Sequence, residues 1–205
     1  MTVQHNLSWK EHCDEICAKV RKSLFLLRKL KHVLPYSAKI QFYNSFILPH
    51  LDYCSTVWYT GQINTIKPLN ILLKRAMRLI LNVPFDTPSA EMFKSLNWMS
   101  IEHRCLYNVS ILVFKATHSL TPSYLNIFNF NSNRTRAASR NDLIVPFARK
   151  DVLKNSFRVL GAKTFNSLPQ TIRASPTLQS FKRAAFKFFI CNFHESLWYF
   201  TSVLF

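Results

Sequence analysis

Residues 16–34 read ICAKVRKSLFLLRKLKHVL, and this stretch decides the fold class. Apolar side chains recur in it every three or four positions, which at about 100° per residue places them along one side of a helix. They are Ile16, Val20, Leu24, Leu27, Leu30 and Leu34. The opposite side carries Arg21, Lys22, Phe25, Arg28 and Lys29. The pattern predicts an amphipathic helix with a buried apolar stripe and a basic outer face.

Local signals on either side of this stretch predict where the helix begins and ends. Ser8-Trp9-Lys10-Glu11 has the spacing of a capping box, in which the serine oxygen accepts from a first-turn amide and the glutamate reaches back. Pro35 cannot continue a helix without losing a hydrogen bond. We therefore expect one helix from about Ser8 to just before Pro35.

Similar patterns predict further helices along the chain. Residues 37–59 form a second helical stretch, which Pro49 should kink or break because proline lacks the amide donor. A third helix is expected from Pro68, since proline is favoured at the first helical position. Its polar side carries Lys74, Arg75 and Arg78. Later helix starts are expected at Thr87-Pro88, Ser100, Thr121-Pro122 and Ser175-Pro176.

The composition agrees with a mainly helical protein. A chain of 205 residues with 48% hydrophobic side chains can bury one ordinary core, or two small ones packed together. Glycine occurs only at Gly61 and Gly161, against a usual abundance of roughly 7%. Neither a glycine-rich phosphate loop nor a turn-rich β-sandwich is therefore expected.

The charge is large, positive and unevenly distributed. There are 27 Lys and Arg residues against 10 acids, a net charge of +17. Residues 1–80 carry 12 bases and 4 acids and residues 130–187 carry 12 and 2, whereas residues 81–129 carry 3 of each. Such a balance implies a polyanionic partner, either nucleic acid or an anionic membrane surface.

A change in composition predicts one boundary in the chain. Residues 1–128 are expected to be a helical region, and residues 129–142, rich in Asn, Ser and Arg, a basic linker. Residues 143–190 follow as a small basic α+β appendage, which opens on a short strand or hairpin at Leu143-Ile144-Val145 and closes with the final helix. The aromatic tail, residues 191–205, is left unassigned.

The cysteines and the apolar end of the chain bear on its location. Five cysteines are an odd number, and no secretion signal precedes them, so we expect reduced thiols and an intracellular protein of the nucleus or cytoplasm. The last 18 residues are apolar, but Asn192, His194, Glu195 and Ser196 interrupt them. No membrane-spanning helix is expected there.

Residues for catalysis or metal binding are not expected. Two-metal phosphoryl transfer needs clustered carboxylates, whereas the aspartates are scattered, and Asp14 and Glu15 are helix neighbours that point apart. Cys13 and Cys17, four apart beside His12, suit a metal site in spacing. The missing second pair of ligands favours core packing of both cysteines instead, and the pair Cys191 and His194 is equally weak. We expect no catalytic residue, no metal site and no cofactor.

The basic face of the first helix is the stronger functional signal. A charged outer face usually mixes signs, but Arg21, Lys22, Arg28 and Lys29 follow one another without an intervening acid. This favours contact with nucleic acid over a merely solvated face. Phe25 lies within the face, where it could stack on a base or pack against a neighbouring helix.

Several short motifs, in order and spacing, resemble one family of polymerases. In the first half these are Leu7-Ser8-Trp9-Lys10-Glu11-His12, Pro49-His50-Leu51-Asp52-Tyr53, Val57-Trp58 and Leu73-Lys74-Arg75-Ala76-Met77-Arg78-Leu79-Ile80 with Pro84. In the second half they are Leu96-Asn97-Trp98, Arg104, Lys115, His118, Arg134, Arg136, Val145-Pro146, Gly161-Ala162-Lys163, Phe165-Asn166-Ser167-Leu168-Pro169 and Ser180-Phe181-Lys182-Arg183. Over about residues 7–190 the chain resembles the region after the palm in reverse transcriptases of non-LTR retrotransposons (LINE elements), most of all the jockey-like elements.

The resemblance implies a helical thumb-type bundle and the segment that follows it. The members of this family are RNA-directed DNA polymerases, in which the thumb grips the primer-template duplex. Their other parts are the palm with its aspartates, the fingers and usually an upstream endonuclease. The double-aspartate turn of the palm and the cysteine-histidine knuckle of some relatives have no counterpart here, and the sequence after about Ile190 matches nothing in the family. The chain is therefore expected to be no enzyme on its own.

These observations lead to one functional expectation and one alternative. The chain is expected to bind RNA, RNA–DNA hybrid or another duplex, and to pack against palm and fingers domains of the same element. The candidate contacts are Arg21, Lys22, Arg28, Lys29, Lys74, Arg75, Arg78, Arg134, Arg136, Arg140, Lys182 and Arg183. The alternative is a basic amphipathic module for protein interaction or a membrane surface, which would use Phe193, Trp198 and Phe200.

Overall fold

The structure, a computed structural model, describes residues 9–61, 63–131 and 141–202, with side chains as far as residue 194. The described residues form helices joined by turns and contain no strand, so the mainly α prediction is confirmed. The elements are α1 (Lys10–Leu30), α2 (Tyr36–Phe42), the π-helical turn η1 (Tyr43–Ile47), α3 (Leu48–Asp52), α4 (Ser55–Trp58), α5 (Ile63–Leu81), α6 (Ser89–Leu96), α7 (Ile101–Thr117), the 3₁₀ turn η2 (Ser123–Leu125), α9 (Asp151–Lys154), α10 (Phe157–Asn166), α11 (Gln170–Arg173) and α12 (Leu178–Ser202).

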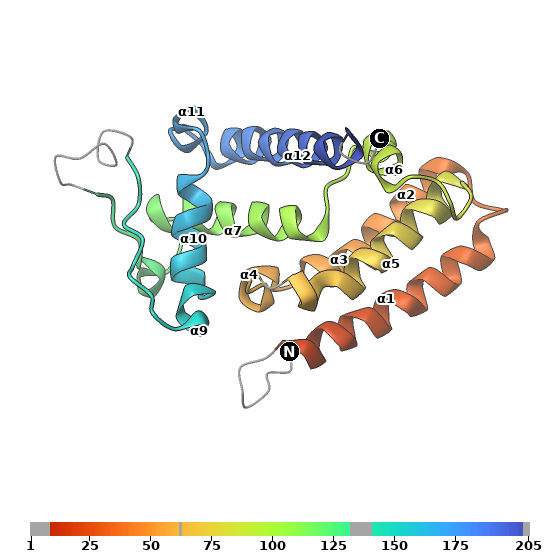
Figure 1. Cartoon of the computed structure of the whole chain (residues 1–205), viewed down its shortest axis with the longest axis horizontal. Helices are drawn as coiled ribbons and strands as arrows, with labels where there is room; N and C mark the ends of the chain where they lie inside the picture. The colour runs from red at the N-terminus through yellow and green to blue at the C-terminus, as the bar shows by residue number, and fades with distance from the viewer. Residues whose placement is uncertain (1–8, 62, 132–140, 203–205) are drawn as a thin grey trace.

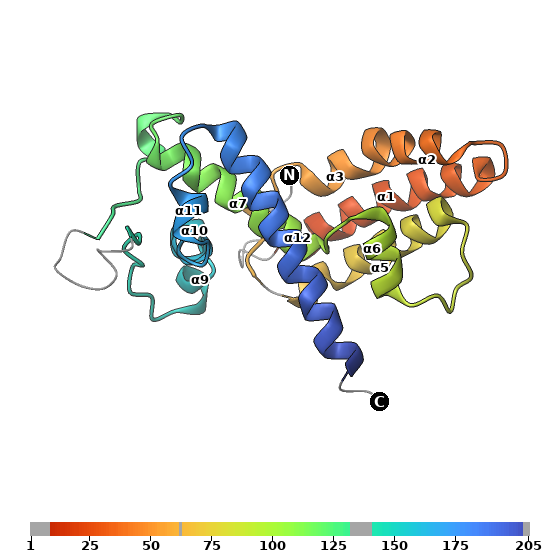
Figure 2. The ribbon, with the colours of Figure 1, turned by 90° about the horizontal axis from the view of Figure 1, so that it is seen from above.

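Two long helices near the N-terminus lie side by side and run in the same direction (Figures 1 and 2). They are α1 and α5, and the chain returns between them through α2, η1 and α3. Helix α7 occupies the middle of the molecule and contacts α4, α5, α10 and α12. Helix α12 crosses over α7 and reaches α6 (Figure 2). The C-terminal helices are thereby joined to the N-terminal ones through α7.

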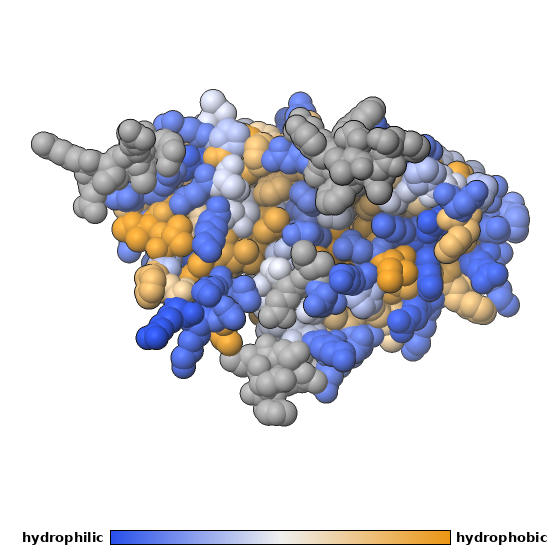
Figure 3. Space-filling view, in the orientation of Figure 1, coloured by the Kyte–Doolittle hydropathy of each residue, from blue (hydrophilic) through white to orange (hydrophobic). Residues whose placement is uncertain are grey.

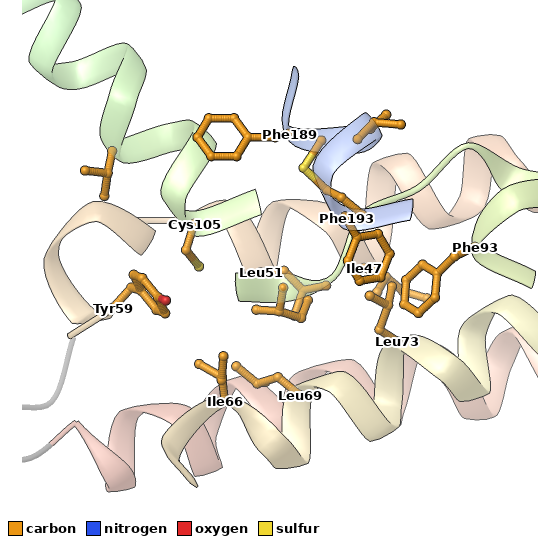
Figure 4. Close-up of a cluster of buried hydrophobic side chains, with 14 of the residues drawn as sticks. Ile47, Leu51, Tyr59, Ile66, Leu69, Leu73, Phe93, Cys105, Phe189 and Phe193 are labelled. Atoms are coloured by element: carbon orange, nitrogen blue, oxygen red, sulfur yellow. The ribbon is translucent and has the colours of Figure 1, made fainter. Parts of the chain in front are cut away.

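One hydrophobic core runs through the molecule (Figure 4). Leu51 of α3 and Leu69 of α5 meet Cys105 of α7, and Phe189 and Phe193 of α12 close the same cluster. All five side chains are buried. The segment after residue 142 therefore shares a core with the helices that precede it.

Helix α1 follows its predicted pattern with two corrections. It begins at Lys10, with Trp9 at the N-cap and no side-chain cap bond, while Ser8 of the expected capping box lies outside the described residues. The stripe from Ile16 to Leu27 is buried, but Leu30 is 40% exposed. The helix ends at Leu30 rather than near Pro35, because the chain turns there toward α2.

The next two stretches show how proline acts in this fold. The predicted interruption near Pro49 is confirmed: the π-helical turn η1 precedes it, and Pro49 lies in the first turn of α3. The expected start at Pro68 is wrong, because α5 begins five residues earlier, at Ile63, and contains the proline. Pro68 removes only the hydrogen bond to the carbonyl of Asn64, close to the start of the helix, where few intrahelical bonds have yet formed.

The expected helix starts farther along have mixed outcomes. Ser100 caps α7 as predicted, since its hydroxyl accepts a hydrogen bond from the His103 amide. Thr87-Pro88 precedes α6 with Pro88 itself at the N-cap, whereas Thr121-Pro122 starts only the single turn η2. The final helix begins after Thr177 instead of after Ser175, whose hydroxyl donates to Ile172 O.

The strand predicted at Leu143-Ile144-Val145 is wrong. The described residues show a single antiparallel bridge, between Phe130 and Leu143. The backbone groups of Leu143 are taken by a side chain: its amide donates to Asn166 Oδ1 and its carbonyl accepts from Asn166 Nδ2, both at 2.8 Å. Most of the expected linker, residues 132–140, lies outside the described residues.

The tail also departs from the expectation. Residues 191–202, left unassigned from sequence, continue α12 without a break. Phe193 of this segment is buried and meets Phe93 edge-on at 4.8 Å between ring centroids. His194 Nε2 lies 3.2 Å from Trp98 O. The start of the expected tail is therefore part of the core.

Two ion pairs inside the fold each contain an aspartate. Arg104 of α7 binds Asp52 of α3 through two hydrogen bonds of 2.5 and 2.6 Å. The same carboxylate accepts from Asn108 Nδ2 at 3.4 Å. Near the other end of the molecule, Arg173 Nη1 lies 2.9 Å from Asp142 Oδ1, and both side chains are almost fully buried. These pairs join segments far apart in sequence.

Candidate nucleic-acid interface

The outer face of α1 carries the predicted basic side chains. Its buried stripe packs against α5 and η1, which turns the other side of the helix to the solvent. Arg21, Lys22, Arg28 and Lys29 are all exposed, as the helical period predicted. Phe25 is exposed among them, at 59%, so packing against a neighbouring helix is not its role.

The second predicted set of basic residues lies on the neighbouring helix. The stripe of α5 from Leu69 to Ile80 is buried against α1 and α7, so that its polar face turns outward. Arg75 is exposed, and Lys74 and Arg78 are half-buried. Because α1 and α5 run side by side in one direction, Arg75 and Arg78 lie next to Arg21 and Arg28.

The two helices enclose a groove of about 360 Å³. Its polar lining consists of Arg21, Arg28, Arg75 and Arg78, with no acidic residue among the lining side chains. Leucines form the floor, and two phenylalanines complete the lining: Leu24, Leu72, Leu79, Phe25 and Phe85. We call this feature the α1–α5 groove. In the view of Figure 3, hydrophilic side chains predominate on the right half, where Figure 1 places α1 and α5, and larger hydrophobic areas lie on the left half.

Each phenylalanine of the α1–α5 groove has a cation over its ring. Lys29 Nζ lies 5.1 Å from the centroid of Phe25, and Arg78 Cζ lies 4.8 Å from the centroid of Phe85. Phe85, in the turn after α5, is 83% exposed. Such contacts are attractive because the ring face carries partial negative charge. At exposed sites they contribute about 0.5–1 kcal/mol each, so they favour the observed ring positions.

One nitrogen of the groove lacks an acceptor. Arg78 Nε is buried and has no hydrogen-bond partner in the described part of the chain. A buried donor without an acceptor is costly. Basic residues in the last turn of a helix also offset the helix macrodipole, and Arg28, Lys29 and Arg78 all have that position. The interaction with the helix macrodipole explains why these basic residues lie in the last turns of the helices. It does not explain why Arg78 Nε has no hydrogen-bond partner.

The remaining predicted contacts lie elsewhere. Lys182 and Arg183 belong to α12, which packs on α6, α7 and α11 and not along the α1–α5 groove. Lys182 is half-buried and Arg183 exposed. Arg134, Arg136 and Arg140 lie outside the described residues. Among the candidate contacts that the structure describes, Arg21, Arg28, Arg75 and Arg78 are the ones that line a common groove.

His12, Cys13 and Cys17 are packed in the core, whereas Cys191 of the second pair considered for metal binding is exposed and His194 is half-buried. Cys13 and Cys17 are 3% and 1% exposed, which confirms the packing interpretation. Burial raises the pKa of the Cys13 thiol to about 12, so the thiol is neutral at physiological pH. His12 lies edge-on to Trp9 and Trp58, and burial lowers its pKa. Over the described ranges, no three His, Cys, Asp or Glu side chains are grouped to hold a metal ion.

The aspartates are held apart by the fold. Asp52 pairs with Arg104, Asp142 with Arg173 and Asp151 with Lys154. These three carboxylates come from different parts of the chain and each has its own cation. These aspartates, which were considered as ligands for catalytic metal ions, form ion pairs within the fold.

Sequence reasoning missed the groove itself and one of its rings. Each helix was predicted with a basic face, but nothing in the sequence says that the two faces adjoin. Phe85 follows Pro84 in a short turn and carries no local signal of function. The shared pattern of the two helices, an apolar stripe beside closely spaced arginines, was the only available hint.

The described residues of the tail bear on the membrane alternative. Phe193 faces the core, as given above, while the side chains of Trp198 and Phe200 lie outside the described ones. Across the part of the chain that the structure describes, no helix combines the length and the apolar character that crossing a bilayer requires.

Comparisons with known proteins give the chain no relative. The motifs described above are therefore the only basis for the likeness to reverse transcriptases, which remains a prediction. No family model, no curated protein and no solved structure matches this chain.

Proposed function

We propose that this chain binds duplex nucleic acid without catalysing a reaction, as a thumb-like part of an RNA-directed DNA polymerase of the non-LTR type. One observation carries the proposal: α1 and α5 gather Arg21, Arg28, Arg75 and Arg78 along one groove with no acid in its lining. Lys22, Lys29 and Lys74 lie on the same two helices. A row of cations on a rigid pair of helices suits the phosphates of a polynucleotide.

The shape of the contact favours A-like duplexes. Helical faces with long basic side chains reach phosphates and sugar hydroxyls across a wide, shallow minor groove, as in RNA duplexes and RNA–DNA hybrids. Such contacts position the duplex and carry no base sequence information. The candidate ligand is thus a hybrid or RNA duplex of any sequence, which is also what the resemblance implies.

A salt titration tests this proposal. Each phosphate bound by a cation releases counterions, so the logarithm of the affinity falls linearly with the logarithm of the salt concentration. Replacing Arg21, Lys22, Arg28 and Lys29 by glutamine should weaken binding to an RNA–DNA hybrid and reduce the slope by about 1 for each phosphate that is no longer neutralised. Fluorescence anisotropy at several salt concentrations measures both quantities.

A matched variant controls for net charge. Lys67, Lys94, Lys163 and Lys187 are exposed and lie outside the α1–α5 groove, so glutamine at these four positions removes the same charge. We expect this control to keep most of the affinity and most of the slope. Equal weakening in the two variants would show that net charge alone attracts the duplex. Unchanged binding of the first variant would show that its basic face is only solvated.

A second candidate, a protein-interaction surface, is favoured by several exposed apolar side chains. Around the end of α1 and the start of α2, Leu26, Val33 and Tyr36 are 54%, 79% and 53% exposed, and Phe46 of η1 is 56% exposed. Ser23 Oγ, on α1, donates to Phe46 O and so links the two elements. Exposed apolar patches mark protein interfaces. We place the palm and fingers domains at these side chains, and Val33→Glu should weaken binding of separately added palm and fingers domains, measured by sedimentation.

A further inference from the structure

The two phenylalanines of the α1–α5 groove are not needed to hold a duplex by its phosphates. Phe25 and Phe85 are 59% and 83% exposed, and neither contributes to the core. Exposed aromatic rings next to cations are what proteins use to bind unpaired bases, because every base has a face on which a ring can stack. Their place among four arginines calls for a ligand with both a flat face and a negative charge.

We propose that the α1–α5 groove binds an unpaired nucleotide segment next to the duplex, with bases stacked on Phe25 and Phe85. The inference rests on the proposed function, because it adds a single-stranded subsite to the same nucleic-acid surface. The groove volume of about 360 Å³ falls within the range of small-molecule sites, which is about 300–1,000 Å³, and so suits a nucleotide.

The cations over the rings fit this ligand. Arg78 lies over one face of the Phe85 ring at 4.8 Å, and an exposure of 83% leaves the opposite face open. Lys29 lies in the same way over Phe25, at 5.1 Å. A base can stack on the open face while the cation on the other side keeps the ring from turning. A ring that is already held loses little freedom when its ligand binds.

The arginines of the groove would bind the phosphate of the nucleotide. A nucleotide stacked on a groove ring places its phosphate within the same enclosure, where Arg21, Arg28 and Arg75 meet it without a competing acid. Arg78 belongs to the same lining, and its guanidinium lies over the Phe85 ring. A lipid headgroup would use the same cations but would leave the two rings without a stacking partner.

The test compares two ligands that differ only in an unpaired extension. One is a blunt RNA–DNA hybrid, and the other is the same hybrid with about four unpaired nucleotides on one strand, a length typical of one stacking site. Extensions on either strand are compared in turn. We expect the extended hybrid to bind the full chain at least about fivefold more tightly for each base that stacks, since stacking is worth about 1–3 kcal/mol per base. A 2-aminopurine base in the extension should lose fluorescence on binding.

Ring variants then separate stacking from apolar contact. Leucine at Phe25 and Phe85 keeps an apolar side chain but removes the flat face, so it should abolish the advantage of the extended hybrid over the blunt hybrid, measured as the ratio of the two affinities in the same variant. Tryptophan at both positions should keep the advantage. Phe147, 89% exposed and outside the groove, provides the control: Phe147→Leu should change nothing.

The outcomes distinguish the two proposals. If the chain binds blunt and extended hybrids equally, or if the leucine variant keeps the advantage, the stacking inference is overturned and the duplex function stands. If the chain binds free single strands but no blunt duplex, the stacking site is supported and the duplex function falls. If it binds neither ligand but binds vesicles of anionic lipid, both proposals are overturned.

Discussion

Replacing Gly161 by alanine should destabilise the protein, although alanine is the better helix former. Gly161 lies inside α10, where α10 crosses α7. A Cβ atom there would lie 2.9 Å from Val113 Cγ2 and 3.0 Å from Phe128 Cζ. The change therefore sets a gain in helix propensity against a steric clash, and the two magnitudes decide the sign.

The magnitudes favour the clash. Gly→Ala in a helix interior gains about 1 kcal/mol. An added carbon in a packed core costs about 1–3 kcal/mol, and the cost is at the upper end when the neighbour cannot move. Val113 is fully buried and β-branched, hence stiff about its first torsion, while Phe128 is half-buried and can yield. We expect Gly161→Ala to lower the free energy of unfolding by about 1–2 kcal/mol.

Chemical denaturation followed by circular dichroism measures this destabilisation, and thermal unfolding should show a Tm lower by roughly 2–8 °C. A double variant isolates the clash. Val113→Ala removes the atom at 2.9 Å, so adding Gly161→Ala to that background should recover stability instead of reducing it further. A Gly161→Ala protein that is as stable as the parent would refute the close approach of α7 and α10.

Three further outcomes are expected. With magnesium or manganese the purified chain should extend no primer on RNA or DNA, because a metal-holding group of carboxylates is needed; incorporation that disappears when one aspartate becomes asparagine would overturn this. Serine at both Cys13 and Cys17 should cost about 1–2 kcal/mol without releasing zinc, since both thiols pack in the core. In the native protein at pH 8, iodoacetamide should modify the exposed Cys191 thiol well before the Cys13 thiol. The pKa of Cys13, about 12, keeps this thiol protonated at pH 8. Fast modification of Cys13 would show that the N-terminal end of α1 opens.

The sequence predicts the single helices of this fold well, because their signal is local. The period of α1 is set by residues a few positions apart, and it correctly places Val20 and Leu27 inside and Arg21 and Arg28 outside. The same holds for the Ser100 cap, where one hydroxyl acts three residues along the chain. Errors at helix ends, as at Leu30 and Pro68, arise because the turn to the next element depends on where that element packs.

The parts that were missed depend on contacts between distant segments. The groove needs α1 and α5 side by side, and no local pattern specifies that pairing. At Leu143 the β-branched neighbours favour a strand, but the Asn166 side chain takes both backbone groups that a strand would use. The helical tail did have a local signal, since Phe181, Ala185, Phe189 and Phe193 recur every fourth position and are all buried.

The position of α12 has a consequence for how the chain folds during synthesis. Its contacts are long-range for a helical protein: Tyr107 Oη donates to Lys182 O, 75 residues away, and His194 meets Trp98 O across 96 residues. Helices α1 and α5 can bury their leucines against each other while the ribosome is still translating the rest of the chain. The side of α7 that packs against Phe181 and Phe189 stays exposed to solvent until α12 has been synthesised. We therefore expect the α1–α5 groove to form early and the second half of the core to close last, more slowly than in helical bundles with local contacts.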